Sequence, residues 1–113
     1  MKKINIVKES KDFEKAIHNG RFYKNNLFII YIAENTYQNY RFGISVGKKV
    51  STKAVIRNKL KRQMKNIIDK YKNIYENNKD YIIIVRKSCL EKDYQELENS
   101  FLEIMNKITL KEN

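Results

Sequence analysis

The chain has 113 residues, 42% of them hydrophobic, and a formal net charge of +11. This length predicts a single domain spanning residues 1–113, and the hydrophobic fraction excludes a disordered chain. A positive excess of this size indicates a polyanionic partner, which is RNA, DNA or an anionic membrane surface.

The first element predicted along the chain is a short amphipathic helix. Ser10 is a residue type that caps helices, and Gly20 is typical of the position just after a helix end. Between them, Phe13, Ala16 and Ile17 recur at helical spacing and form an apolar stripe.

Three strands are predicted next. Residues 21–24 predict a short strand, and residues 27–33 a strand rich in β-branched and aromatic side chains. Residues 40–47 alternate strictly, which separates a core side from a second side. The core side carries Phe42, Ile44 and Val46, with Phe28 and Ile30 of the preceding strand, and the second side carries Arg41, Gly43 and Ser45, near Tyr31. The polar residues 34–39 predict an antiparallel hairpin between the last two strands.

The second half predicts a helix, a strand and a helix. Residues 53–75 predict a long helix, residues 80–87 a strand buried on both faces, and Asp93 with Glu96 a capping box that opens a last helix. The order α-β-β-β-α-β-α predicts an α+β sandwich, with helices packed on a mixed four-stranded sheet. The expected buried stripes are Ile56, Leu60, Met64, Ile67, Ile68 and Tyr71 on the long helix, and Leu97, Phe101, Ile104, Met105 and Ile108 on the last.

A basic stretch opens the long helix. Residues 48–66 contain eight Lys and Arg residues and no acid. Arg57, Lys61 and Lys65 are spaced four apart, so they share one helix face, with Asn58 and Arg62 beside it. A face that only keeps a helix solvated usually mixes both signs, because like charges at this spacing destabilise a helix. The stretch therefore favours binding to a polyanion.

The choice among polyanions is narrowed by the same helix. A membrane-surface helix needs an exposed apolar face, and this helix needs its apolar face for the core, so membrane binding is disfavoured. Phosphate contact alone does not distinguish DNA from RNA. The single cysteine, Cys89, cannot form an internal disulfide, and no long apolar stretch follows the basic N-terminus, so we expect a cytoplasmic protein.

The segments ISVGKKV and AVIRNKLKRQMKN, residues 44–50 and 54–66, resemble the signature block of the protein subunit of bacterial ribonuclease P. Residues 12–20 and 80–87 resemble the family's first helix and last strand, so the resemblance covers nearly the whole chain. It implies the fold of the second domain of a ribosomal small-subunit protein, with a left-handed β-α-β crossover. Lys59 stands where the family has Arg, and the spacer between Lys49 and Arg57 is one residue longer, which leaves the conformation of residues 51–53 open.

The resemblance also implies a division of labour. The RNA subunit performs the chemistry with bound Mg²⁺, and the protein binds that RNA and the 5′ leader of precursor tRNA, assisting removal of the leader without another protein partner. The residues agree with a protein that has no catalytic group and no metal site of its own. His18 is the only histidine, and the carboxylates are scattered. A plain RNA-binding module, such as a ribosomal protein, remains the alternative, whereas a self-sufficient nuclease is disfavoured.

Two RNA-binding surfaces follow from the resemblance. The first is a basic block that contacts the catalytic RNA, formed by Lys48, Lys49, Arg57, Asn58, Lys59, Lys61, Arg62 and Lys65. The second is a leader-binding cleft formed by Phe13, Ile17, Asn25, Tyr31 and Arg41. Many family members carry an aromatic ring at the position of Ile17. Ordinary packing of the first helix on the sheet explains Phe13 and Ile17 equally well.

Overall fold

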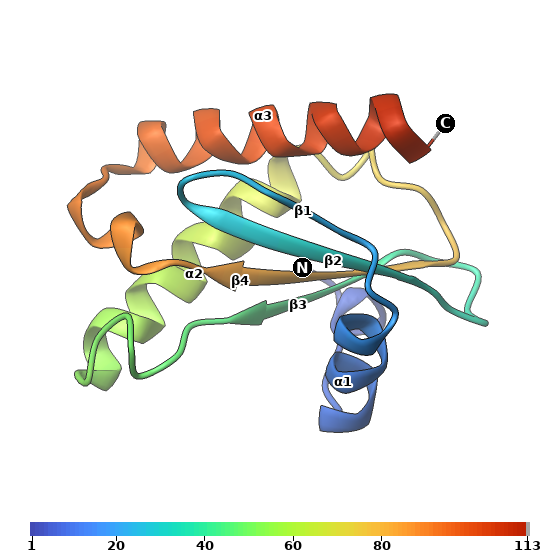
Figure 1. The fold of residues 1–113 in the computed structure, drawn as a ribbon, viewed down its shortest axis with the longest axis horizontal. Coiled ribbons are helices and arrows are strands. Elements are labelled where there is room, and N and C mark those ends of the chain that lie inside the picture. The colour runs from blue at the N-terminus through green and yellow to red at the C-terminus, as the bar shows by residue number, and fades with distance from the viewer. Residues whose placement is uncertain (113) are drawn as a thin grey trace.

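The sheet is organised around a central buried strand. In the computed structural model, which describes residues 1–112, β4 (Lys79–Val85) lies between β2 (Phe28–Glu34) and β3 (Arg41–Ser45), and β1 (Phe22–Lys24) completes the edge beside β2 (Figure 1). β1 and β2 are antiparallel, β2 and β4 are antiparallel, and β3 and β4 are parallel. The sheet is therefore mixed and four-stranded, as the sequence predicts.

Three α-helices cover the sheet. They are α1 (Ser10–His18), α2 (Ala54–Lys70) and α3 (Tyr94–Glu112). A short 3₁₀ helix, η1 (Lys3–Asn5), precedes α1, and a second, η2 (Lys87–Glu91), follows β4. The order α-β-β-β-α-β-α confirms the α+β prediction. The chain runs from β3 through α2 to the parallel β4, so α2 forms a crossover; its left hand stays an expectation from the resemblance.

The hairpin predicted at residues 34–39 is wrong, because β2 and β3 are not neighbours in the sheet. β4 separates them and pairs with both. The reason is burial: Ile82 and Ile83, on opposite faces of β4, are both fully buried, and only a central strand with layers on both sides can bury them. The β1–β2 pair is the one antiparallel hairpin among residues 1–112, with its turn at Asn25 and Asn26.

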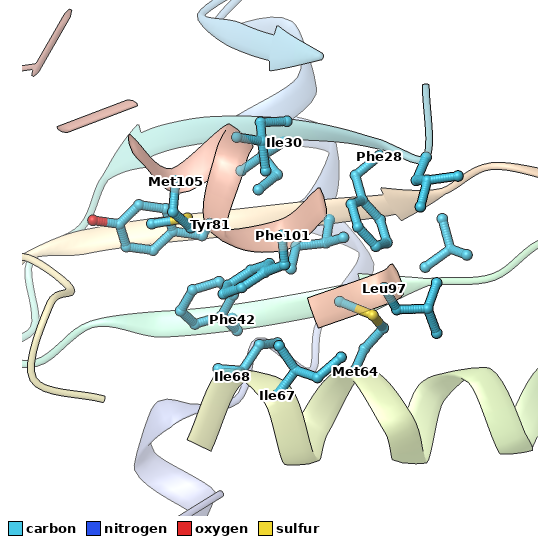
Figure 2. Packing of buried hydrophobic residues seen from close by; sticks show 14 of the residues in the cluster. Phe28, Ile30, Phe42, Met64, Ile67, Ile68, Tyr81, Leu97, Phe101 and Met105 are labelled. Atoms are coloured by element: carbon cyan, nitrogen blue, oxygen red, sulfur yellow. The ribbon is translucent and has the colours of Figure 1, made fainter. Parts of the chain in front are cut away.

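The main core lies between one face of the sheet and the two long helices. Phe28 and Ile30 of β2 and Phe42 of β3 meet Phe101 of α3 there, and all four are fully buried (Figure 2). The predicted apolar stripe of α3 is buried throughout. In the stripe of α2, Leu60, Met64, Ile67 and Ile68 are buried, whereas Ile56 and Tyr71 are half-buried. α1 lies on the opposite face of the sheet, over a second, smaller cluster (Figure 1).

Helix ends agree with the sequence at α3 and differ at the other two helices. The capping box of α3 is confirmed, because Asp93 Oδ1 accepts from the Glu96 N–H at 2.8 Å and Glu96 Oε1 accepts from the Asp93 N–H at 3.1 Å. α1 starts at Ser10 rather than being capped by it. α2 ends at Lys70, five residues before the predicted end at Tyr75, because the chain turns to bury the Tyr75 ring in the core.

Candidate nucleic-acid interface

α2 presents two different faces. The apolar face packs into the main core through Leu60, Met64, Ile67 and Ile68. The other face, with the turn that precedes the helix, carries the predicted basic block. Lys48 and Lys49 of the turn and Asn58, Lys59, Arg62 and Lys65 of α2 are exposed, and Arg57 and Lys61 are half-buried. The structure therefore separates a core surface from a cationic surface on one helix, as helical spacing predicts.

The cations of this block lack internal counterions. Within the described chain, residues 1–112, none of its Lys and Arg side chains lies within ion-pair distance of a carboxylate. Lysines on other elements are paired, for example Lys70 with Glu98 at 3.2 Å and Lys79 with Glu34 at 3.0 Å. The unpaired charges on α2 are thus free to meet the phosphates of a polyanion.

The loop before α2 is held by its own hydrogen bonds. The Val50 N–H donates to the Gly47 carbonyl at 3.0 Å, and the Lys53 N–H donates to Ser51 Oγ at 3.1 Å. Arg57 Nη1 donates to the Ser51 carbonyl at 2.9 Å. These bonds fix residues 51–53, where the spacer departs from the family pattern, and they give Arg57 a structural task besides its charge.

The start of α2 adds to the positive potential. Lys53 occupies the N-cap position without a side-chain hydrogen bond to the helix, and the first turn contains no acid. The first backbone N–H groups of a helix are unpaired and carry its positive dipole end. Acidic residues usually compensate that end, and here Lys53 lies there instead.

The far end of α2 is tied to α3. Glu98, whose side chain is 8% exposed, accepts hydrogen bonds from the Tyr71 hydroxyl and from Lys70 Nζ. The Tyr71 hydrogen bond, followed by that of Lys70, holds the pKa of the Glu98 carboxyl below its ordinary value. The cationic face of α2 is therefore presented by a helix that is anchored at both ends.

The second candidate surface is the sheet face on the side of α1. The strand registers align Phe22 with Tyr31, Tyr31 with Ile82, and Ile82 with Gly43, so these four residues form one row across the sheet. A neighbouring row, which runs through Lys24, Ile29, Ile84 and Ser45, has no fully buried member. Figure 1 shows α1 beneath only one part of the sheet. The side chains of this neighbouring row are therefore partly accessible.

α1 contributes one ring to this surface. Phe13 lies directly over Gly43 and Ile82, because a Cβ placed on Gly43 would be 2.6 Å from Phe13 Cζ and 2.8 Å from Ile82 Cδ1. Phe13 and Tyr31 are both half-buried and belong to the same cluster. Ile17, one turn further along α1, is 38% exposed. Phe13, Ile17 and Tyr31 of the predicted cleft therefore lie on α1 or on the face that it covers.

Arg41 lies on the same face but is engaged internally. Its Nε and Nη2 donate to the two carboxylate oxygens of Asp80 at 2.8 and 2.6 Å, and Nη2 lies 3.4 Å from Asp12 of α1. The Tyr37 ring covers the guanidinium at 4.4 Å. The hydrogen bonds to Asp80 raise the pKa of Arg41 above its ordinary value. Arg41 therefore fixes α1 to the sheet, and its charge is largely compensated by these two acids.

The structure places the side chain of Asn25 elsewhere. Its Oδ1 accepts from the Leu27 and Phe28 N–H groups at 3.0 and 2.9 Å, and its Nδ2 donates to the carbonyl and hydroxyl of Ser100 on α3. The amide thus shapes the β1–β2 turn and ties it to α3. It is not brought together with Phe13, Ile17 and Tyr31.

Sequence reasoning missed Phe22 as a member of this surface. Its ring is 48% exposed and lies 5.5 Å, centroid to centroid, from that of Tyr31. The available signal was the alternation in residues 22–24, which puts Phe22 and Lys24 on one side of β1 and Tyr23 on the other. That alternation alone does not say which strand pairs with β1.

Among residues 1–112, no three His, Cys, Asp or Glu side chains are grouped so that they could hold a metal ion. No helix in the same range has the length and apolar character needed to cross a bilayer.

Comparisons with known proteins agree with this geometry. A family model described as Ribonuclease P matches residues 1–109. The ribonuclease P protein component of Bacillus cereus (strain AH187) is 34% identical over 112 residues, covering 98% of this chain and 96% of the relative. A Staphylococcus aureus RNase P protein, in a mutant form with defective mRNA degradation activity, superposes with a TM-score of 0.87 at 29% identity, covering 95% of this chain and 90% of the other. The RNase P protein of Thermotoga maritima gives 0.80 at 26% identity, covering 89% and 94%.

Proposed function

Because the chain belongs to the bacterial ribonuclease P protein family, we propose that its α2 face binds the catalytic RNA and that its open sheet face binds the 5′ leader of precursor tRNA. Membership makes the protein a subunit of ribonuclease P, an RNA-based endoribonuclease of tRNA 5′ maturation, and the ribonuclease P RNA its partner.

The cationic face of α2 carries the first half of the proposal. It combines Lys and Arg side chains that have no carboxylate partner among residues 1–112 with a positive helix end. Binding of such a surface to RNA releases counterions, so affinity falls steeply as salt concentration rises. Lys59 keeps the charge of the family's Arg but contacts a phosphate as a point charge instead of a two-pronged fork.

The rings on the α1 side of the sheet support the second half. Phe13 and Tyr31 are half-buried, so part of each ring remains open to a ligand. Nucleobases stack on aromatic rings largely independently of base identity, which suits a leader of variable sequence. The leader-binding set proposed here is Phe13, Ile17, Tyr31 and the backbone around Gly43, with Arg41 holding α1 in place.

The protein's part in catalysis is positioning. We propose, as membership of the family implies, that Mg²⁺ is held mainly by the RNA. When bound by the RNA, such an ion would supply activation of water and stabilisation of the leaving oxygen. The residues of this chain bind the RNA backbone and orient the leader, and no side chain here is proposed to react.

Reconstitution with the cognate RNA subunit tests the α2 assignment. Lys61 and Lys65 are the residues to replace by Ala, because they share one face and, unlike Arg57, hold no part of the loop. If both contact phosphates, the slope of log affinity against log salt becomes shallower by about 1.4 to 1.8. The matched control replaces Lys107 and Lys111 of α3, which removes equal charge. An unchanged slope in the α2 variant would refute RNA contact through this face.

A second measurement tests leader binding. The holoenzyme is expected to bind precursor tRNA more tightly than mature tRNA, and the protein without RNA is expected to cleave neither. Equal affinity for the two tRNAs would contradict leader recognition and favour a plain RNA-binding module. Cleavage of precursor tRNA by RNA-free protein would overturn the division of labour.

A further inference from the structure

Phe22 is a large apolar ring that the fold leaves exposed. It belongs to the edge strand β1 and points away from the main core, because its neighbour Tyr23 packs against that core instead. Single exposed hydrophobic residues are common on protein surfaces and need no function. Phe22 differs from such a residue because its ring continues an aromatic surface, lying 5.5 Å from the Tyr31 ring at an angle of 42°.

The strand register connects the aromatic surface of Phe22 and Tyr31 with α1. Phe22 pairs with Tyr31, Tyr31 pairs with Ile82, and the Phe13 ring lies over Ile82 and Gly43. The three rings therefore follow one row across the four strands. Phe13 lies at the α1 end and Phe22 at the β1 edge, where Phe22 is 48% exposed.

The charge around Phe22 fits a phosphate backbone. Lys24 lies two residues further on the same side of β1, is exposed, and has no carboxylate partner in the described part of the chain. The preceding Arg21 is already held by Glu34 at 3.1 Å and Glu112 at 2.9 Å. Lys24 is thus the free cation beside the ring. A ring for a base next to a cation for a phosphate is the arrangement that binds single-stranded nucleic acid.

We propose that Phe22 is a further leader-binding residue, which stacks a nucleotide of the single-stranded RNA leader beyond the one on Tyr31 while Lys24 contacts its phosphate. This inference rests on the proposed leader binding and deepens it. The proposed role of Phe22 also compensates for the aromatic ring that is missing at Ile17. Where many family members carry a ring on the first helix, this chain has an exposed aliphatic side chain, and Phe22 supplies a ring from the sheet instead.

The test uses the reconstituted holoenzyme and precursor tRNAs with leaders of increasing length. Phe22→Ala is expected to weaken binding about 5- to 150-fold, the range for loss of one stacked base, only for leaders long enough to reach β1. Phe22→Tyr keeps the ring and should restore affinity, whereas Phe22→Leu keeps apolar bulk and should not. Affinities for mature tRNA and for the RNA subunit should stay unchanged in all three variants.

A fluorescent leader gives a direct readout of stacking. 2-Aminopurine is placed at successive leader positions, and its fluorescence is expected to be quenched on binding at the position that stacks on Phe22. Phe22→Ala should relieve the quenching at that position and leave it at the position that stacks on Tyr31. Thermal unfolding of each variant checks that β1 is intact.

The outcomes separate this inference from the proposed function. A wild-type preference for precursor tRNA that Phe22→Ala leaves intact at every leader length would overturn the inference alone. Full affinity in Phe22→Leu, or an equal loss for mature tRNA, would also overturn it, because the ring would then act through packing. A wild-type dimer that Phe22→Ala dissolves without changing leader affinity would assign Phe22 to self-association. Equal wild-type affinity for precursor and mature tRNA would overturn both proposals together.

Discussion

The ring of Phe13 rests on the backbone of Gly43. A Cβ at Gly43 would lie 2.6 Å from Phe13 Cζ and 2.9 Å from Cε1, so residue 43 must be glycine for the ring to sit where it does. The close approach gives Phe13 a packing role, since it seats α1 on the sheet, and fixes its ring in the row that ends at Phe22. Packing and base stacking are compatible uses of one ring.

Gly43→Ala is expected to displace this ring. The added methyl group meets Phe13 and Ile82, and overpacking of this kind costs about 1 to 3 kcal/mol of the free energy of unfolding. Because the displaced ring is part of the proposed leader site, affinity for precursor tRNA should fall while affinity for the RNA subunit stays the same. Urea unfolding and tRNA binding measure the two effects.

Gly47→Ala is the matched control for that substitution. A Cβ at Gly47 would meet nothing within 4 Å, and its backbone does not require glycine. The variant should keep wild-type leader affinity and unfold at the same or a slightly higher urea concentration, because it reduces the entropy of the unfolded chain. A Gly43→Ala protein as stable as Gly47→Ala would contradict the overpacking argument.

Asp80→Asn is expected to destabilise the protein by about 3 kcal/mol, at the low end of the cost of breaking a buried ion pair. Asp80 and Arg41 are joined by two hydrogen bonds, with side chains only 7% and 11% exposed, so the variant leaves a buried guanidinium with Asp12 as its remaining acid. Asp12→Asn serves as the milder comparison, since its contact is longer, at 3.4 Å, and more exposed. Chemical unfolding should rank the two variants in this order; the reverse order would mean that Asp12 is the main partner.

The parts of this structure that sequence predicts well are those set by local periodicity. The cationic and apolar faces of α2 follow from helical spacing, and the two sides of β3 follow from alternation. The capping box at Asp93 and Glu96 is equally local, since both partners lie within one turn. Each of these predictions needs only residues that are close in the chain.

The order of strands in a sheet depends on residues that are far apart in the chain, and the pairing predicted from the sequence was wrong. Residues 34–39 look like a hairpin, but the strand beside β2 is β4, whose residues lie 45 to 57 positions after their β2 partners. β4 takes this place because only a central position buries both of its faces. Local patterns also do not reveal the role of Phe22, because that role depends on which β2 residue it pairs with. The amide of Asn25 likewise finds its partner on α3, 75 residues away, which no local pattern indicates.

Asp93→Ala should remove one end of the capping box. The Glu96 N–H then loses its acceptor at 2.8 Å, and loss of an N-cap acceptor costs about 1 kcal/mol of the free energy of unfolding. Asp93 precedes α3 and is not part of the basic block, so affinity for the RNA subunit should not change. Asp93→Asn keeps an acceptor and should unfold close to wild type. If Asn is as destabilising as Ala, the charge at the helix end, and not the hydrogen bond, is what matters.

Tyr81 should make the protein sensitive to alkaline pH. Burial raises the pKa of its hydroxyl to about 12, whereas a tyrosine in the unfolded chain titrates near 10. Below pH 10 the hydroxyl is neutral in both states and the folded state keeps its full stability. Between about pH 10 and 12 only the unfolded state ionises, so up to about 3 kcal/mol of stability is lost across that window.

Tyr81→Phe isolates this contribution. At pH 7 the variant loses only the hydrogen bond that the Glu76 N–H donates to the Tyr81 hydroxyl at 3.2 Å, and is expected to be about 1 kcal/mol less stable than wild type. As pH rises above 10, wild type loses stability faster than the variant, because the variant has no hydroxyl to ionise at this position. Burial also raises the pKa of Tyr75, so both proteins keep a common alkaline decline. Urea unfolding from pH 8 to 11 should therefore show two converging curves, and curves that stay parallel would exclude Tyr81 as the titrating group.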